Sequence, residues 1–455
     1  MEQEVTLQQM LSAREARVIR QQALLKQYGQ NLVSFSLNIA GPVKNGPVIR
    51  RTFQEGLHRL TDALQTARIP ILHREQINAV TGCEAIWVVG GDARDVKLIC
   101  AELEGEDPLG RLFDMDVIAP NGDKLDRKGL GHAPRPCLVC GKVGSGCASR
   151  RLHSVEALQA ATQKRMCAFF AQKDGEMIAG QAVRALLYEV CTAPKPGLVD
   201  RFNTGSHRDM DIFTFMDSTA ALAPYFRRAV SIGQETALLP PDATFRRLRR
   251  AGLGAERAMF AATKGINTHK GAIFSLGTVC AAAGRLWKPD APWAGAEAVL
   301  RECAAMSKKA IEEDFATIRA QFAQTQGQKL YLEHGLRGIR GELAEGLPSV
   351  LHVGLPALEA ALERGATLEQ AGTAALLQLI AQVSDTNLIA RGGLEGQCWA
   401  AQAAAVSTLD PETLEALDRA FIQQNLSPGG CADLLAITYF THFCEALSGS
   451  ISDSR

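Results

Sequence analysis

Residues 194–211 read PKPGLVDRFNTGSHRDMD and combine two prolines and two glycines with eight charged, histidine or asparagine side chains. Pro194 and Pro196 exclude a helix interior and a central strand, because proline lacks the backbone N–H that both structures use. The stretch is therefore predicted to be a long, shaped loop. Loops rich in ionisable groups hold ligands more often than they build cores, and a solvated surface loop is the alternative.

The composition indicates a soluble protein of two domains. The chain has 455 residues, too many for one ordinary core, and is 46% apolar and 22% charged. Its net charge is zero, so we expect no nucleic-acid partner. We find no secretory signal and no apolar run long enough to span a membrane, so we expect a cytoplasmic protein with no membrane partner. Its twelve cysteines are then expected to stay reduced.

The first 150 residues alternate between helical and strand-like patterns. Helical periodicity occurs at 8–28 and 53–67, and strand patterns occur at 31–37, 85–89 and 111–119. This alternation predicts an α/β domain with helices around a small mixed sheet.

After about residue 155 the strand patterns nearly vanish, and long segments rich in alanine and leucine dominate. Helices are predicted at 176–190, 213–230, 272–286, 294–324, 368–383 and 411–424. We therefore expect a larger, all-α C-terminal domain. The boundary is expected within residues 155–175, which gives domains of residues 1–165 and 166–455.

A pair of carboxylates marks the N-terminal domain. Residues 110–116 read GRLFDMD, and on a strand Asp114 and Asp116 face the same way. Adjacent carboxylates suit Mg²⁺, which takes oxygen ligands from both proteins and phosphates. Arg111 and Lys44 offer positive charge for a triphosphate. The alternative is a pair of exposed acids on the polar face of a strand.

Metal-ligating residue types follow within seventeen residues, namely Cys137, Cys140, Cys147 and His153. Three thiolates and an imidazole can form a closed, four-coordinate Zn²⁺ site. The alternative is a set of reduced cysteines in a glycine-rich loop, because the spacing is only loosely that of a zinc finger.

The C-terminal domain carries four polar islands, of which residues 194–211 are the first. The others are GINTHKG at 265–271, GIRGE at 338–342 with DTNLIARGG at 385–393, and SPGG at 427–430, which continues to Asp433. Glycines let the backbone approach a ligand, and basic side chains neutralise phosphates. Carboxylates bind Mg²⁺ or transfer protons. The alternative is that Asp209 and Ser427 only cap helices and that the glycines only end them.

The islands supply candidate site residues by side-chain type. Phosphate-binding candidates are Lys195, Lys270, Arg340 and Arg391, and carboxylate candidates are Asp209, Asp211, Asp385 and Glu342. His207 and His269 are further candidates, each with a structural role as the alternative. The sequence contains no Walker, kinase or Rossmann motif.

From about residue 175 to its end, the chain resembles triphosphoribosyl-dephospho-CoA synthase of the citrate lyase system. The motifs are PKPGLVDRFNTGSHRDMD, GINTHKGAIFSLG, GIRGE, DTNLIARGG and NLSPGGCADLLA. Residues 1–165 resemble the enzyme that transfers the phosphoribosyl-dephospho-CoA group to apo-citrate lyase acyl carrier protein, through REARVIRQQALL, SFSLNIAGPVK, GRLFDMDVIAPNG and PCLVC…C…H. Together these resemblances imply a fused, bifunctional transferase whose N-terminal domain is nucleotidyltransferase-like.

For the C-terminal domain, the resemblance implies that the ribose 2′-hydroxyl of 3′-dephospho-CoA attacks C1′ of the ATP ribose and that adenine leaves. Such a transfer needs a base at the hydroxyl, an acid near adenine and a held triphosphate. We expect Lys195, Lys270 and Arg391 at the phosphates. We expect Mg²⁺ at Asp209 and Asp211, which with Asp385, Glu342 and His269 are the catalytic candidates. Further binding candidates on the matched motifs are Asn203, His207, Asn267, Thr268, Arg340, Asn387, Gly392, Gly393, Gly429, Gly430 and Asp433.

For the N-terminal domain, the resemblance implies that a serine of the carrier protein attacks the α-phosphate of that product and expels pyrophosphate. Asp114 and Asp116 would then be catalytic and hold Mg²⁺, and Arg111 and Lys44 would hold the phosphates. The expected partners are the citrate lyase acyl carrier protein and small nucleotides. Two alternatives remain open: the equivalent malonate decarboxylase system, or a nucleotide N-glycoside hydrolase fused to a zinc-stabilised docking module.

Overall fold

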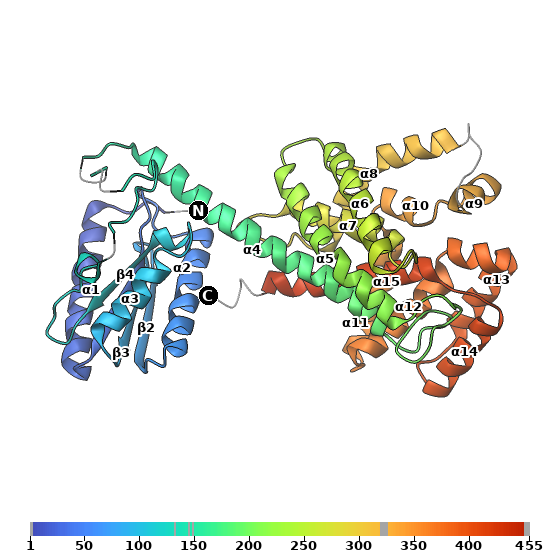
Figure 1. Ribbon diagram of the computed structural model, residues 1–455, viewed down its shortest axis with the longest axis horizontal. Helices are drawn as coiled ribbons and strands as arrows, with labels where there is room; N and C mark the ends of the chain where they lie inside the picture. Colours follow the sequence, from blue (N-terminus) through green and yellow to red (C-terminus); the bar gives the residue numbers. More distant parts are fainter. Residues whose placement is uncertain (1–2, 132, 144–145, 148–149, 319–325, 450–455) are drawn as a thin grey trace. The chain divides into compact units, whose positions relative to one another are not determined.

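A computed structural model describes residues 3–131, 133–143, 146–147, 150–318 and 326–449. The chain forms two compact units, Met1–Ala171 and Gln172–Arg455 (Figure 1). The first unit contains a four-stranded sheet, and the second is built from helices. The division falls inside one long helix, α4 (Val155–Cys191).

Helices and strands alternate along the N-terminal unit. Its elements are α1 (Leu7–Tyr28), β1 (Asn31–Leu37), α2 (Pro47–Thr66), β2 (Ile71–Ala79), β3 (Gly82–Val89), α3 (Ala93–Leu103) and β4 (Phe113–Ile118), with 3₁₀ turns at Gly110–Leu112 and Lys128–Leu130. The strand order is β2-β3-β1-β4, and every neighbouring pair is antiparallel. The expected small sheet is confirmed, and the expected mixed sheet is wrong.

The unpredicted strand β2 explains this error. β2 and β3 form a hairpin in which Ala79 pairs with Gly82, and a hairpin reverses the direction of the chain. β2 is an edge strand with charged side chains such as Arg74 and Glu75, and it contains few of the β-branched and aromatic residues that mark a strand. Because this strand is not predicted, the hairpin is not predicted either.

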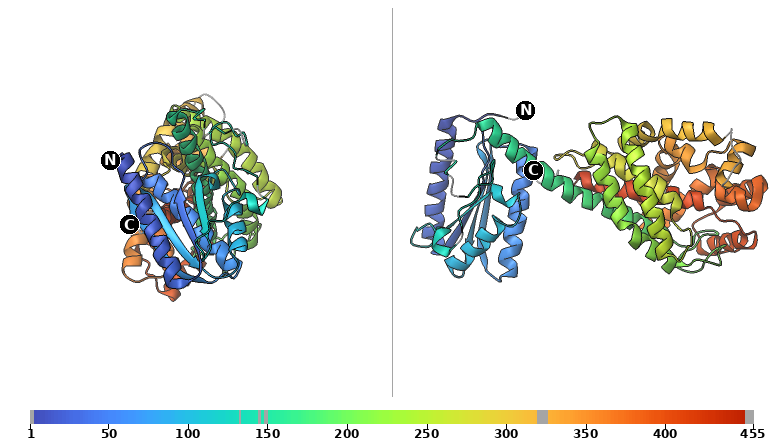
Figure 2. Two further views of the ribbon diagram at one scale, coloured as in Figure 1. Left: turned by 90° about the vertical axis from the view of Figure 1, so that its left-hand side faces the viewer. Right: turned by 45° about the horizontal axis from the view of Figure 1, so that its top comes forward.

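The two faces of the sheet are covered by helices on opposite sides, α1 on one and α2 on the other (Figure 2). Under α2 and α3 the face is apolar, with Phe35, Trp87 and Phe113 fully buried. Under α1 only one end is apolar, where Leu24 packs near Leu32. At its other end this face carries polar side chains, which are Ser34, Ser36, Glu84, Asp114 and Asp116. The sheet therefore offers a charged end beneath α1.

The C-terminal unit is mostly helical, as expected. After the second half of α4 its elements are α5 (Ile212–Glu235), α6 (Pro241–Ala262), α7 (Lys270–Leu286), α8 (Ala296–Ile318), α9 (Gln326–His334), α10 (Gly338–Ala344), a π-helical turn (Val350–Gly354), α11 (Leu355–Glu363), α12 (Leu368–Gln382), α13 (Thr386–Val406), α14 (Pro411–Gln423) and α15 (Gly429–Gly449). Across the described part of the chain, we find no helix both long and apolar enough to cross a membrane.

Helix α7 is almost completely buried and packs closely against α5. A Cβ atom on Gly233 would lie 2.0 Å from the carbonyl oxygen of Ala281, and one on Gly284 would lie 2.1 Å from that of Val230. Only glycine permits such an approach of two helices. The small residues of α5 and α7 therefore set the position at which α7 begins.

Candidate active sites

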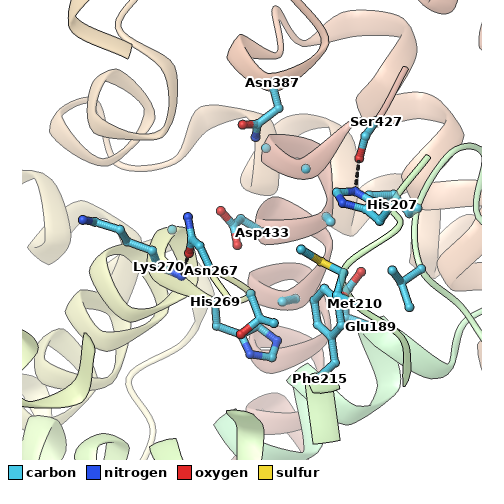
Figure 3. Close-up of a pocket in the computed structure, with 18 of the residues that line it drawn as sticks. Glu189, His207, Met210, Phe215, Asn267, His269, Lys270, Asn387, Ser427 and Asp433 are labelled. Atoms are coloured by element: carbon cyan, nitrogen blue, oxygen red, sulfur yellow. Dashed lines mark hydrogen bonds between the residues drawn. The ribbon is translucent and has the colours of Figure 1, made fainter. Parts of the chain in front are cut away.

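The helical unit contains a cavity of about 430 Å³ (Figure 3). Its wall comes from the end of α4, from residues 194–211, here called the PKPG loop, and from the first turns of α5, α7, α13 and α15. The first N–H groups of a helix carry partial positive charge and attract anions. The N-termini of α7, α13 and α15 at one cavity therefore suit a phosphate ligand.

Most of the candidates from the four polar islands line this cavity together. They are Lys195, His207, Asn267, Thr268, His269, Lys270, Asn387, Arg391, Gly429, Gly430 and Asp433. Outside its lining lie Asn203, Asp209, Asp211, Arg340, Glu342, Asp385, Gly392 and Gly393. The fold thus brings segments that are far apart in the sequence to one site.

Two carboxylates hold the PKPG loop in shape. Asp200 accepts a hydrogen bond from the backbone N–H of Lys195 at 2.9 Å. Asp418 of α14 accepts hydrogen bonds from the N–H of Gly197 at 2.9 Å and from the side-chain amide of Asn203 at 2.8 Å. Gly197 has φ 69°, and a Cβ atom there would lie 2.2 Å from a backbone carbonyl oxygen, so the turn needs glycine. Asn203 therefore shapes the loop from outside the cavity lining.

His207 connects the PKPG loop to the starts of α13 and α15. Its Nε2 lies 2.9 Å from Ser427 Oγ, and its Nδ1 lies 3.3 Å from Arg391 Nη2. Because a guanidinium only donates, Nδ1 accepts, and the ring proton is on Nε2. Burial and then the charge of Arg391 lower the pKa of His207, so the ring is neutral near pH 7.

Lys195 and Glu189 form a buried ion pair in the cavity wall. They are 1% and 4% exposed, and Lys195 Nζ lies 2.5 Å from Glu189 Oε1. Burying two charges is expensive, and apolar replacements are often at least as stable, so such a pair suggests a functional role. Glu189 was not predicted. Its signal was a single acid in the apolar run LLYEVC at residues 186–191.

Asp433 of α15 meets the N-terminus of α7 (Figure 3). It accepts a hydrogen bond from the N–H of Ala272, and a Cβ atom on Gly271 would lie 1.8 Å from its Oδ2. Burial, followed by the charges of Glu189 and Asp385, raises the pKa of Asp433 well above its usual value. A desolvated carboxyl group under the influence of other acidic groups is stabilised by a proton or a cation.

His269 is 3% exposed and packs edge-on against Phe215. Thr268 Oγ1 donates to Ser218 Oγ at 2.8 Å, and this oxygen lies 2.7 Å from His269 Nδ1. Ser218 therefore donates to Nδ1, which places the ring proton on Nε2. That atom is buried and has no hydrogen-bond partner among the described residues. Burial and then the charge of Lys195 lower the pKa of His269 to about 3.

Several predicted carboxylates outside the cavity lining have structural partners. Asp211 caps α5, and the hydrogen bonds from its first turn lower the pKa of Asp211. Asp385 caps α13 and also accepts a hydrogen bond from the N–H of Cys431 at 2.8 Å, which joins α13 to α15. Glu342 accepts hydrogen bonds from the N–H and Oγ of Ser349 at 3.2 and 2.6 Å.

The N-terminal unit has a cavity of about 460 Å³ at the charged end of the sheet, beneath α1. Five basic side chains line it, which are Arg14, Arg17, Lys44, Arg111 and Arg135, together with two carboxylates, Glu84 and Asp114. Burial and then the charge of Arg14 lower the pKa of Lys44. Burial and then the charge of Arg135 lower the pKa of Arg111. This concentration of positive charge suits a polyphosphate ligand.

Asp114 and Asp116 share one face of β4, because they alternate with buried residues along the strand. Each has its own cation: Asp114 Oδ1 lies 3.0 Å from Arg135 Nη2, and Asp116 Oδ2 lies 2.5 Å from Lys124 Nζ. Asp114 lines the cavity, whereas Asp116 lies outside its lining. Asp114 is thus the better placed of the two to meet a ligand.

Cys137, Cys140, Cys147 and His153 come together in the segment after β4. One potential ligand atom from each lies within 4.8 Å of the other three. Within the described part of the chain, no cysteine is joined to another by a disulfide.

Two protein-family models match the chain. Residues 175–452 match the ATP:dephospho-CoA triphosphoribosyl transferase family, and residues 5–169 match the apo-citrate lyase phosphoribosyl-dephospho-CoA transferase family. A protein named CitXG from Haemophilus influenzae is 36% identical, and one from Leuconostoc mesenteroides is 35% identical, each over 96% of both chains. A 2-(5″-triphosphoribosyl)-3′-dephosphocoenzyme-A synthase from Pectobacterium atrosepticum is 42% identical over 58% of this chain and 87% of its own.

Proposed function

The chain belongs to the family in which an apo-citrate lyase phosphoribosyl-dephospho-CoA transferase is fused to an ATP:dephospho-CoA triphosphoribosyl transferase, and from this we propose which cavity performs which reaction. It is a bifunctional transferase that makes the citrate lyase prosthetic group and attaches it. We assign the synthesis to residues 166–455 and the attachment to residues 1–165.

The helical cavity supports the first assignment, because it joins three helix N-termini to the buried Lys195–Glu189 pair within the matched family domain. Triphosphoribosyl transfer breaks the bond from ATP ribose C1′ to adenine and forms a bond from C1′ to the 2′-oxygen of dephospho-CoA. The hydroxyl loses its proton, and the departing adenine takes up one proton. The developing positive charge on the ribose and the intact triphosphate both need fixed charges nearby.

We assign the triphosphate to Lys195, Lys270 and Arg391, together with the N-terminal N–H groups of α7, α13 and α15. When the ammonium of Lys195 turns to a phosphate oxygen, the carboxylate of Glu189 is released to take the proton of the attacking hydroxyl. Neutral His269 adds no positive charge that would oppose the oxocarbenium-like ribose.

The residues of the helical cavity fit Mg²⁺. Asp433 offers a carboxylate whose pKa is raised by burial first and by the charges of Glu189 and Asp385 second, and Asn267 and Asn387 offer amide oxygens in the same lining. Hard oxygen donors of this kind suit Mg²⁺, which when bound neutralises the triphosphate. We therefore move the proposed metal site from Asp209 and Asp211 to Asp433, since Asp211 is engaged as a helix cap.

The N-terminal cavity suits the attachment step because five basic side chains surround it. In the proposed reaction, a serine hydroxyl of apo-citrate lyase acyl carrier protein attacks the α-phosphate of the intermediate, and pyrophosphate leaves. The five basic side chains neutralise the leaving group, and Asp114 is the proposed Mg²⁺ holder, as in nucleotidyltransferase chemistry. We propose a cytoplasmic location, which the lack of disulfides among the described residues supports.

Two variants assayed in both half-reactions test the assignment. Asp433→Asn is expected to lower adenine release from ATP and dephospho-CoA by about 100-fold or more, because the carboxylate proposed to hold Mg²⁺ at the triphosphate is lost. The same protein should release pyrophosphate normally when supplied with the triphosphoribosyl intermediate and apo-carrier protein. Arg14→Gln should do the reverse, with about 10- to 100-fold less pyrophosphate release and normal adenine release.

The assignment of one reaction to each cavity is tested by comparing the effects of each variant on adenine release and on pyrophosphate release. If Asp433→Asn and Arg14→Gln each impaired both half-reactions while remaining folded by circular dichroism, the assignment of one reaction to each cavity would be wrong. Asp217→Asn, an exposed carboxylate on α5 outside the cavity lining, is the matched control and should retain both activities.

A further inference from the structure

The cluster of Cys137, Cys140, Cys147 and His153 has the geometry of a metal site. Cys140 Sγ and Cys147 Sγ lie 3.7 Å apart, and all four ligand atoms lie within 4.8 Å of one another. Two thiolates bound to one tetrahedral zinc are separated by roughly 3.8 Å, because each Zn–S bond is about 2.3 Å. The two sulfurs therefore stand at the separation of zinc ligands.

The backbone around the first two cysteines supports the same conclusion. The N–H groups of Val139 and Cys140 donate to Cys137 Sγ, and the N–H of Lys142 donates to Cys140 Sγ. The turn closes with a hydrogen bond of 3.0 Å from the N–H of Gly141 to the carbonyl oxygen of Cys137. N–H donors directed at sulfur stabilise thiolates, the form in which cysteine binds a metal.

The fourth residue provides an independent observation. His153 Nε2 is buried, and it has no hydrogen-bond partner in the part of the chain that the structure describes. A buried polar nitrogen without a partner is costly, and a bond to a metal would satisfy it. We propose that these four residues bind one Zn²⁺ in a closed, four-coordinate structural site.

The site lies directly next to residues that form the N-terminal cavity. Arg135, two residues before Cys137, donates to the carbonyl oxygen of Phe113 at 2.6 Å and pairs with Asp114 at 3.0 Å. The carbonyl oxygen of Pro136 accepts a hydrogen bond of 2.7 Å from Arg111 Nε. Both arginines line the cavity.

Bound zinc is thus a positioning device for two phosphate-binding arginines, and this part of the inference rests on the proposed function of the N-terminal cavity. Zinc fixes the backbone at Cys137, the adjacent Pro136 carbonyl orients Arg111, and Arg135 is held beside Asp114. Loss of zinc should therefore impair the attachment reaction and leave adenine release intact.

The test uses the full-length protein, purified without chelators, and starts with elemental analysis. We expect one zinc per chain, and less than about a tenth of that in Cys140→Ser. Protein reconstituted with Co²⁺ should show thiolate-to-cobalt charge-transfer and tetrahedral ligand-field absorption, which Cys140→Ser and His153→Gln weaken or abolish. The matched control is Cys167→Ser, which changes a partly exposed cysteine of the same unit and should keep its zinc.

The half-reactions are then measured on the same samples. Cys140→Ser should release pyrophosphate at least about 10-fold more slowly than the parent and release adenine at the parent rate. A zinc-free parent protein that takes up neither Zn²⁺ nor Co²⁺, or a Cys140–Cys147 disulfide in the purified chain, would overturn the site. A zinc-free variant with full attachment activity would overturn the positioning role. If the zinc-loaded parent itself released no pyrophosphate, the proposed function of the N-terminal cavity would fail instead.

Discussion

At the scale of single residues, His269 shows how burial fixes a protonation state. With a pKa of about 3 in the folded chain and roughly 6.5 when unfolded, His269 binds more protons in the unfolded state between these values. Its contribution to stability is therefore fully present above pH 6.5 and is lost as pH falls towards 3. The expected slope is about 1.4 kcal/mol per pH unit.

Urea unfolding checks this expectation in a Trp87→Phe background, in which all remaining tryptophans lie in the helical unit. Between pH 6.5 and pH 5 the parent should lose about 2 kcal/mol more unfolding free energy than the same protein carrying His269→Gln. Parallel pH profiles for the two proteins would contradict the assignment of a buried, neutral imidazole.

The candidate residues also show what the sequence could predict at this scale. Lys195, His207 and Asp433 were predicted from their loops, and the structure places all three at one cavity. Glu189 was missed because a helix buries it by tertiary packing, which the local pattern does not reveal. Asp200 lies in the loop of residues 194–211. That its carboxylate accepts hydrogen bonds from backbone N–H groups depends on the geometry of the folded loop, which the sequence alone does not reveal.

At the scale of elements, variants at the start of α5 can distinguish a helix-capping role of Asp211 from a catalytic one. Asp211 accepts the N–H of Thr214 at 2.9 Å, and Asn caps helices about as well as Asp. Asp211→Asn is therefore expected to keep adenine release within about 2-fold of the parent, whereas Asp211→Ala, which removes the cap, should lower the melting temperature. Thermal unfolding and the adenine assay measure both effects.

The same variants could refute this account. A loss of adenine release by about 100-fold in Asp211→Asn, with unchanged thermal stability, would place this carboxylate in the chemistry. The capping role would then be secondary.

Elements with strong periodicity were predicted well, and edge elements were not. β1 was predicted at residues 31–37, where the structure has Asn31–Leu37. α2 begins at Pro47, earlier than the predicted 53, because its first turn is a proline-led segment whose apolar pattern is weak. β2 was missed because this edge strand carries charged side chains. As a result, the relative directions of the strands in the sheet were also predicted wrongly.

At the scale of the whole molecule, two units with different architectures carry two cavities with different charge. The N-terminal cavity has a basic excess, and the helical cavity combines helix N-termini with the carboxylates of Glu189 and Asp433. The sequence identified both halves through motifs, because motifs are local. It could not predict that α4 runs through the division of the chain, since a continuous helix gives no boundary signal in composition.

The most direct test of the central claim measures free adenine by chromatography after full-length protein is mixed with ATP, Mg²⁺ and 3′-dephospho-CoA. The account predicts adenine only when dephospho-CoA is present, and then pyrophosphate once apo-citrate lyase acyl carrier protein is added. Adenine release without the acceptor would indicate an N-glycoside hydrolase, and no adenine under any of these conditions would contradict the account altogether.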